Sequence, residues 1–280
     1  MTDPELIDLI TRLLGGGALT ISPLSGGSWS RVLRVEGASC APVVAKVGNA
    51  EILKEEQIGL AALAATGAVR IPEVIGCGSM GGQGVLLLEH LQTGASPDWE
   101  RFAVDLVALH RPGAESRYGF EIDNHLGSTV QRNTWTPDWA EFNRRFRHGP
   151  LLETVDIDAS DRSLVQKAID SFSHVLGDPP PVLLHGDLWS GNAIPLFDGS
   201  VALIDPAPYY GDPLADLAMM ELFGGFPELF FDAYFAESPV APDPRRLAVH
   251  RLYHALNHLH LFGRGYLGMV RREARLVLDD

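Results

Sequence analysis

Cysteine, basic residues and long apolar runs are scarce in this sequence, and each scarcity excludes a class of protein. Only two cysteines, Cys40 and Cys77, occur among 280 residues, too few for a disulfide framework and without metal-ligand spacing. The net charge of −14 argues against a general nucleic-acid binder, which needs a basic face. No apolar run approaches the roughly 20 residues that span a bilayer, and the acidic N-terminus lacks the basic start of a signal peptide. We therefore expect a cytoplasmic protein with no nucleic-acid or membrane partner.

The predicted secondary structure changes in character near residue 90. Helices are expected at 4–14 and 51–65, and strands at 19–24, 31–36, 42–47, 71–76 and 85–89. Later segments with helical periodicity are 99–109, 139–152, 163–176, 214–222 and 246–262. The sequence therefore predicts an α+β chain, with a small β-rich N-terminal lobe (1–90) joined by a short hinge to a larger, mainly helical C-terminal lobe (91–280).

Two polar motifs follow short apolar runs in the second lobe. The first is His185-Gly186-Asp187-Leu188-Trp189-Ser190-Gly191-Asn192, after the run 182–184. The second is Asp205-Pro206, after the run 201–204. Asp198-Gly199 between the motifs is typical of a hairpin turn, so both motifs are expected at strand ends.

The spacing of these polar residues fits phosphoryl transfer. That reaction needs a carboxylate beside the attacking hydroxyl, and an amide and a carboxylate that hold magnesium on the nucleotide. Asp187 fits the catalytic role, and Asn192 and Asp205 fit the metal-binding roles, as in the protein-kinase fold. The tripeptide at 185–187 alone also occurs in ordinary turns, so the prediction depends on the whole constellation. His185 and Asp216 are expected to support the catalytic loop without transferring protons.

The first lobe is then expected to bind ATP. Lys46 ends an apolar β-branched run, where kinases of this fold place the lysine that pairs with the α- and β-phosphates; an exposed strand-end lysine is the alternative. Glu56 can face Lys46 from the following helix, whereas Glu55 points about 100° away. Other expected nucleotide contacts come from a glycine-rich loop (Gly26, Gly27 and Ser28) and from hinge backbone groups at Glu89 and Leu91.

The motifs also depart from those of regulated protein kinases. Gly186 stands where protein kinases carry an arginine, and Pro206-Ala207 follows Asp205 in place of Phe-Gly. The segment between Asp205 and Asp216 is too short for a switch that phosphorylation orders. These departures favour a small-molecule kinase that needs no activation.

With these residues in place, the chain resembles the fructosamine kinase (ketosamine-3-kinase) family, relatives of aminoglycoside and choline kinases. The matching stretches are Glu56–Leu60, Tyr118–Phe120, Asp123–Ser128, Gln131–Asn133, Trp139, His185–Asn192, Ile204–Ala207, Tyr210-Gly211, Asp216–Met220, Leu222–Phe226, Asn257–Leu259 and Phe262-Gly263. The resemblance covers nearly the whole length. It implies ATP- and Mg²⁺-dependent phosphorylation of a sugar hydroxyl on a ketoamine, either a small molecule or bound to protein.

The acceptor site is predicted less directly. Trp189 lies inside the catalytic loop and can pack against a sugar ring or belong to the core. Asn257 and His258, in a helix rich in histidine and aromatic residues, are candidate acceptor contacts. A related kinase of an aminoglycoside, choline or another small alcohol is the main alternative. A silent nucleotide-binding scaffold and a hydrolase built on Asp187 and Asp205 explain fewer of these residues.

Overall fold

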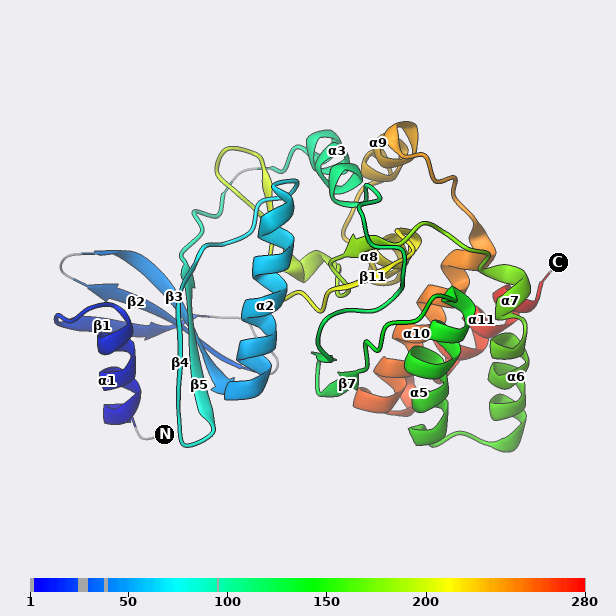
Figure 1. The fold of residues 1–280 in the computed structure, drawn as a ribbon, viewed down its shortest axis with the longest axis horizontal. Helices are drawn as coiled ribbons and strands as arrows, with labels where there is room; N and C mark the ends of the chain where they lie inside the picture. Colours follow the sequence, from blue (N-terminus) through cyan, green and yellow to red (C-terminus); the bar gives the residue numbers. More distant parts are fainter. Residues whose placement is uncertain (1–2, 25–29, 38–39, 95, 280) are drawn as a thin grey trace. The chain divides into compact units, whose positions relative to one another are not determined.

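The computed structural model describes residues 3–24, 30–37, 40–94 and 96–279 (Figure 1). The chain forms two compact units, the first from Met1–Asp98 with Ala193–Pro206 and the second from Trp99–Asn192 with Ala207–Asp280. The predicted α+β class is confirmed, with an antiparallel sheet near the N-terminus and a mainly helical remainder. The lobe boundary at residue 90 stays a prediction. Over the described ranges, no helix has both the length and the apolarity to cross a bilayer.

The first unit is built on a five-stranded antiparallel sheet of order β1-β2-β3-β5-β4. Its elements are α1 (Asp3–Leu13), β1 (Leu19–Pro23), β2 (Arg31–Gly37), β3 (Cys40–Asn49), α2 (Ala50–Thr66), β4 (Val74–Met80), β5 (Gln83–Glu89), β9 (Ala193–Pro195) and β10 (Val201–Leu203). The fourth strand begins three residues later than predicted, because Pro72 has no N–H to donate to a ladder. The predicted hairpin turn is confirmed, since β9 pairs with β10 and Ser200 N–H donates to Asp198 Oδ1 at 3.0 Å.

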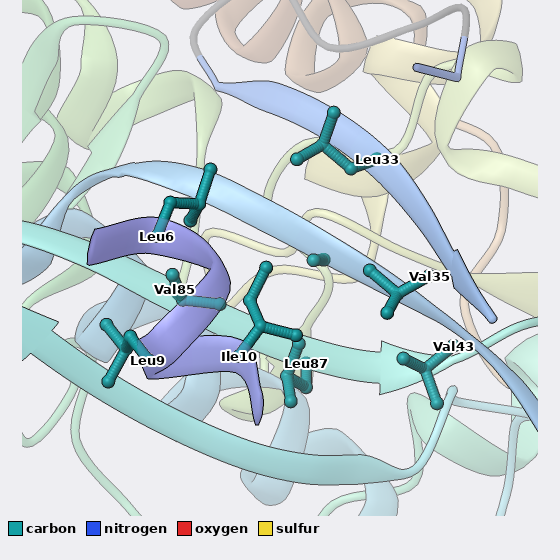
Figure 2. Close-up of a cluster of buried hydrophobic side chains, with 9 residues drawn as sticks. Leu6, Leu9, Ile10, Leu33, Val35, Val43, Val85 and Leu87 are labelled. Carbon is teal, nitrogen blue, oxygen red and sulfur yellow. The ribbon is translucent and has the colours of Figure 1, made fainter. Parts of the chain in front are cut away.

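Helices α1 and α2 cover opposite faces of this sheet. Side chains alternate along a strand, so Val43 and Ala45 of β3 point to one face and Lys46 to the other. Leu9 and Ile10 of α1 pack on the first face, where Figure 2 shows the buried cluster. On the second face, Lys46 contacts Glu56 of α2. The first face of the sheet therefore packs on an apolar core, and the second carries the ion-paired Lys46.

The second unit is mainly helical. Its helices are α3 (Trp99–Leu109), α4 (Trp139–Asn143), the π-helix η1 (Arg144–His148), α5 (Gly149–Thr154), α6 (Ala159–Asp170), α7 (Phe172–Val175), the 3₁₀ turn η2 (Ser190–Asn192), α8 (Leu214–Phe223), α9 (Glu228–Glu237), α10 (Pro244–Phe262), the 3₁₀ turn η3 (Arg264–Tyr266) and α11 (Leu267–Leu278). Its strands are β6 (Asn124–Leu126), β7 (Thr129–Gln131), β8 (Val182–Leu184) and β11 (Tyr209–Gly211). The sequence did not predict α9, α11, β11 or the β6–β7 hairpin.

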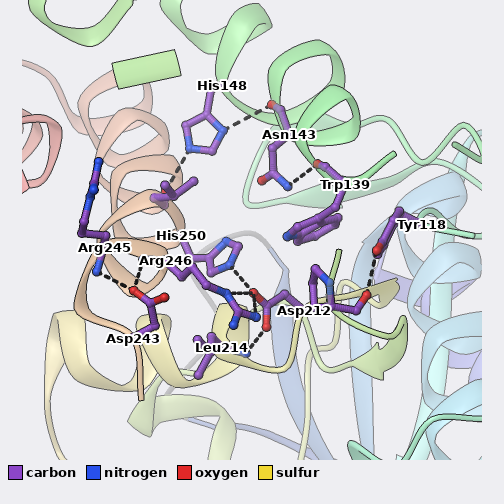
Figure 3. A network of polar contacts seen from close by, with 12 residues as sticks. Tyr118, Trp139, Asn143, His148, Asp212, Leu214, Asp243, Arg245, Arg246 and His250 are labelled. Atoms are coloured by element: carbon purple, nitrogen blue, oxygen red, sulfur yellow. Dashed lines mark hydrogen bonds and ion pairs between the residues drawn. The ribbon is translucent and has the colours of Figure 1, made fainter. Parts of the chain in front are cut away.

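A buried acidic residue fixes helix α10 to the turn that precedes α8 (Figure 3). Asp212 Oδ2 accepts hydrogen bonds from Arg246 Nη2 at 2.7 Å and lies 3.2 Å from His250 Nε2, while its Oδ1 accepts from Leu214 N–H. Burial by itself raises the pKa of Asp212, but His250 and Arg246 outweigh that effect and hold the pKa below its ordinary value. The carboxylate is therefore charged and ties two helices together.

Replacing Asp212 with asparagine should lower the free energy of unfolding by about 3–5 kcal/mol at neutral pH, because Arg246 loses its buried counter-charge. A depressed carboxyl pKa adds stability above the unfolded-state value of about 3.9, and this stability is lost as the pH falls through the folded-state pKa. The difference in the free energy of unfolding between wild type and D212N should therefore become smaller below about pH 4. Urea unfolding at several pH values measures it, with the exposed Asp170→Asn as control. If this difference in unfolding free energy does not change with pH, Asp212 is not a charged, ion-paired carboxylate in the folded protein.

Candidate active site

A pocket of about 380 Å³ lies within the first unit. Its lining is Leu24, Val32, Val44, Lys46, Pro72, Leu88, Glu89, His90, Leu91, Thr93, Ile194, Ile204 and Asp205. Most of these side chains are apolar, and the ionic ones are Lys46, Glu89 and Asp205. Mostly apolar walls with a few placed polar groups are typical of small-molecule sites of about 300–1,000 Å³.

The lysine of this pocket is buried between two carboxylates. Lys46 Nζ lies 2.6 Å from Glu56 Oε1 and 2.6 Å from Asp205 Oδ1, and only 6% of the residue is exposed. The alternative of an exposed strand-end lysine is therefore wrong. Burial lowers the pKa of Lys46, but the two carboxylates outweigh it and the net pKa is raised. Lys46 is therefore held as a cation in the wall of the pocket.

The two carboxylates differ in their surroundings. Burial raises the pKa of Glu56 to about 7, although Lys46 opposes the shift, and the negative charge of Asp205 adds to it. The Asp205 side chain is 36% exposed, and its backbone has a φ of 55°, a left-handed conformation that few non-glycine residues adopt. Strain of this kind often marks functional positions.

The two predicted hinge residues, Glu89 and Leu91, both line the pocket. Both carboxylate oxygens of Glu89 accept hydrogen bonds: Oε2 from the Glu73 N–H at 3.1 Å and Oε1 from Arg70 Nη2 at 2.5 Å. Glu89 N–H donates to Glu73 O. Leu91 lines the pocket one residue past His90. Gly26, Gly27 and Ser28, expected to cover phosphates, lie outside the described residues.

In the second unit, the backbone of the catalytic-loop motif is held by a buried aspartate. Asp216 of α8 accepts hydrogen bonds from the N–H groups of His185 (2.7 Å) and Gly186 (2.9 Å). Gly186 has a φ of 82°, and a Cβ there would lie 2.0 Å from Ala207 O, so only glycine fits this close approach. His185 Nδ1 accepts from Asp187 N–H at 3.3 Å. The segment that leads into Asp187 is therefore fixed.

A buried histidine that the sequence gave no reason to select completes this support. His110 Nε2 lies 3.2 Å from Asp216 Oδ2, and its Nδ1 lies 2.7 Å from Tyr234 Oη. His110 belongs to no recognisable motif, and it lies 106 positions before Asp216 in the sequence. Burial raises the pKa of Asp216, but His110 and other neighbours outweigh it and the net pKa is lowered. Asp216 is thus a charged acceptor for the loop.

Asp187 and Asn192 lie together in this loop. Asn192 Nδ2 donates to Asp187 O at 2.8 Å and to Asp187 Oδ2 at 3.2 Å. These bonds use the nitrogen of the Asn192 amide and leave its oxygen side for a cation. Oxygen ligands of the Asn192 and Asp205 kind are those that Mg²⁺ prefers, together with substrate phosphates and water. In the part of the chain that the structure describes, no three His, Cys, Asp or Glu side chains gather to hold a metal alone.

The predicted acceptor residues have different surroundings. Trp189 is 42% exposed, and a Cβ on Gly191 would lie 2.2 Å from its ring, so the indole covers Gly191 at the surface of the loop. The core interpretation of Trp189 is therefore wrong. Asn257 is 1% exposed, with Oδ1 accepting from Thr129 Oγ1 at 2.6 Å. His258 is half-buried and lies 4.4 Å from the Phe223 ring, centroid to centroid.

An apolar pocket ending in an ion-paired lysine, and a braced loop carrying an aspartate and an asparagine, define a kinase of the protein-kinase-like fold. A family model for fructosamine kinase matches residues 16–280. A "Probable ketoamine kinase" of Synechocystis sp. is 42% identical over 221 residues, covering 77% of this chain and 75% of the relative. The chloroplastic protein-ribulosamine 3-kinase of Oryza sativa subsp. indica is 37% identical over 235 residues, covering 80% and 67%.

A solved structure from Thermobifida fusca, called a "putative fructosamine-3-kinase", has a TM-score of 0.86 and 31% identity, covering 97% of each chain. The chain belongs to the fructosamine kinase family. The resemblance seen in the sequence motifs is thereby confirmed.

Proposed function

We propose that the protein transfers the γ-phosphoryl group of ATP to a sugar hydroxyl of ketoamines, the fructosamine or ribulosamine adducts of glycated amines. The bond from the γ-phosphorus to the β,γ-bridging oxygen breaks, a bond to the sugar oxygen forms, and the hydroxyl proton leaves. The products are ADP and a phosphorylated ketoamine. The observation that carries the proposal is the buried Lys46 between Glu56 and Asp205 in the apolar pocket, in a chain of the fructosamine kinase family.

In this proposal the first unit binds the nucleotide. The apolar walls beside Val44 and Leu88 accept the adenine, and hinge backbone groups at Glu89 and Leu91 bind its polar edge. Lys46 binds the phosphates as a cation. Gly26, Gly27 and Ser28 are proposed to cover the phosphates because of their sequence alone.

The catalytic loop supplies the groups that act on the acceptor. Asp187 accepts a hydrogen bond from the acceptor hydroxyl, orients it and takes its proton late, because the transition state is loose and positioning contributes most of the gain. Asn192 and Asp205 are proposed as Mg²⁺ ligands, and a bound Mg²⁺ neutralises charge on the phosphates. His185 and Asp216 hold the loop.

The acceptor side is proposed to include Trp189 and His258. The exposed Trp189 ring gives an apolar face for a sugar two residues from Asp187. Asn257 is buried and engaged by Thr129, so we propose that it positions α10 and does not touch the acceptor. A ketoamine, free or attached to protein, is the proposed partner, and the cytoplasm is the proposed location.

The test is release of ADP from ATP and Mg²⁺ with a panel of acceptors. The panel contains fructosyl-lysine, ribulosyl-lysine, a glycated protein, an aminoglycoside, choline and unmodified lysine. We expect turnover of the ketoamines only. Mass spectrometry and ³¹P NMR should show the phosphate on the sugar of the product. Turnover should be lost when EDTA removes Mg²⁺. A higher kcat/KM for the aminoglycoside or choline would instead assign the protein to a different small-alcohol kinase activity.

A further inference from the structure

The β6–β7 hairpin carries a buried amide whose three hydrogen bonds join distant segments of the second unit. Gln131 is fully buried. Its Nε2 donates to Asn124 Oδ1 at 2.8 Å and to Ala207 O at 3.1 Å, and its Oε1 accepts from Tyr253 Oη–H at 2.9 Å. A buried polar network in which each member is satisfied fixes one arrangement of the segments it joins.

One of these segments is the backbone that backs the catalytic loop. Ala207 N–H donates to His185 O at 2.9 Å, and Ala207 O is so close to Gly186 that no Cβ fits between them. On its other side the segment is held by the hairpin, since Gln131 binds Ala207 O and Asn124 Nδ2 donates to Pro208 O at 2.9 Å. A shift of Ala207 must therefore move Gly186, the residue that precedes Asp187.

The turn side of the same hairpin contacts helix α10. Thr129 Oγ1–H donates to Asn257 Oδ1 at 2.6 Å, and Asn257 Nδ2 donates to Leu126 O at 3.4 Å. Asn257 is buried, and the next residue is the half-buried His258. The hairpin thus holds the helix segment on which the proposed acceptor contact lies.

We infer that the β6–β7 hairpin is a positioning element for phosphoryl transfer, and that its base and its turn side position different parts of the site. Gln131 and Asn124 at its base set the catalytic loop through Ala207, and Thr129 near its turn sets His258 through Asn257. The inference rests on the proposed function for the acceptor half. Neither Gln131 nor Thr129 is a catalytic residue, because each acts through another residue.

The base of the hairpin is tested by Gln131→Met, which keeps the side-chain volume and removes all three hydrogen bonds. Misplacement of a catalytic group by about 1 Å costs about 10²-fold, so we expect kcat to fall about 10- to 100-fold. The loss should be the same with every acceptor, including water in slow ATP hydrolysis, and the KM for ATP should stay within about twofold of wild type. Val130→Ala, which alters an exposed side chain of the same hairpin, is the matched control.

The turn side is tested by Thr129→Val, which is close to the original shape and removes one hydrogen bond. We expect the KM for fructosyl-lysine to rise about two- to tenfold, the range of one typical hydrogen bond. Its kcat, the KM for ATP and the rate of ATP hydrolysis should be unchanged. Gln131→Met should change kcat alone, and Thr129→Val should change the acceptor KM alone. A general loss of structure would change both quantities in both variants.

Either half of the inference can fail separately. A folded Gln131→Met protein with kcat within about twofold of wild type overturns the role of the base, and equal effects of Thr129→Val on both substrates overturn the role of the turn side. If Gln131→Met does not fold, Asn124→Leu removes both the donor to Pro208 O and the acceptor for Gln131 Nε2, and an unchanged kcat in that variant overturns the same point. If the wild type phosphorylates no ketoamine, the proposed function fails. The role of the hairpin base can still be tested in that case, from the effect of Gln131→Met on the rate of ATP hydrolysis.

Discussion

Replacing Asp187 with alanine is expected to lower kcat by about 10²- to 10⁴-fold, the usual contribution of a positioned acid or base. Asp187 has a fixed place in the loop, because His185, Asn192 and, through the preceding glycine, Asp216 all bind the motif. Removing the carboxylate removes the group proposed to orient the acceptor hydroxyl. The KM for ATP should stay within about twofold of wild type, because each residue that lines the proposed nucleotide pocket belongs to the first unit.

Two companion variants make this result interpretable. Asp187→Asn keeps the size of the side chain but cannot take a proton, and it should lose nearly as much activity as Asp187→Ala. Asp232→Ala, an exposed aspartate on α9, should have no effect. Single-turnover ADP release and calorimetric nucleotide titration give the two quantities. An Asp187→Ala protein that keeps wild-type turnover would remove Asp187 from the mechanism.

The second large effect is expected at Lys46. Changing it to methionine should reduce kcat/KM for ATP by about 10²- to 10³-fold, because a preorganised cation in a water-poor site stabilises developing phosphate charge. The protein should still fold, since the buried Glu56, whose pKa is already raised to about 7, can become protonated once its cation is lost. Asp205 is partly exposed and can remain charged.

The matched control for this change is Lys54→Met. Lys54 lies on the same helix as Glu56, is exposed, and donates to Gln57. Its replacement removes the same charge from the first unit without touching the pocket, so nucleotide affinity and turnover should not change. Thermal unfolding with and without ATP separates lost binding from lost stability. Equal losses in Lys46→Met and Lys54→Met would mean that net charge, and not the position of Lys46, determines nucleotide affinity.

Local patterns in the sequence predicted much of the first unit, including the pairing of Lys46 with Glu56. The helix at 99–109 has the predicted bounds, and α2 differs by one residue at each end, because Asn49 caps its first turn and Gly67 ends it. The elements that were missed are the helices α9 and α11 and the short strands β6, β7 and β11. Three-residue strands carry too little alternation to be distinguished from loops.

The sequence by itself determined the family of the chain and the candidate residues of its site, because Asp187, Asn192, Asp205 and Lys46 lie in motifs whose spacing along the chain is the signal. Only the tertiary structure decided what holds these side chains. Lys46 meets Asp205 across 159 residues, His110 meets Asp216 across 106, and Gln131 meets Tyr253 across 122. Such pairs depend on the path of the backbone, and no local pattern encodes them. Burial, which encloses Lys46 between two carboxylates and leaves Trp189 at the surface, is likewise a property of the packed chain.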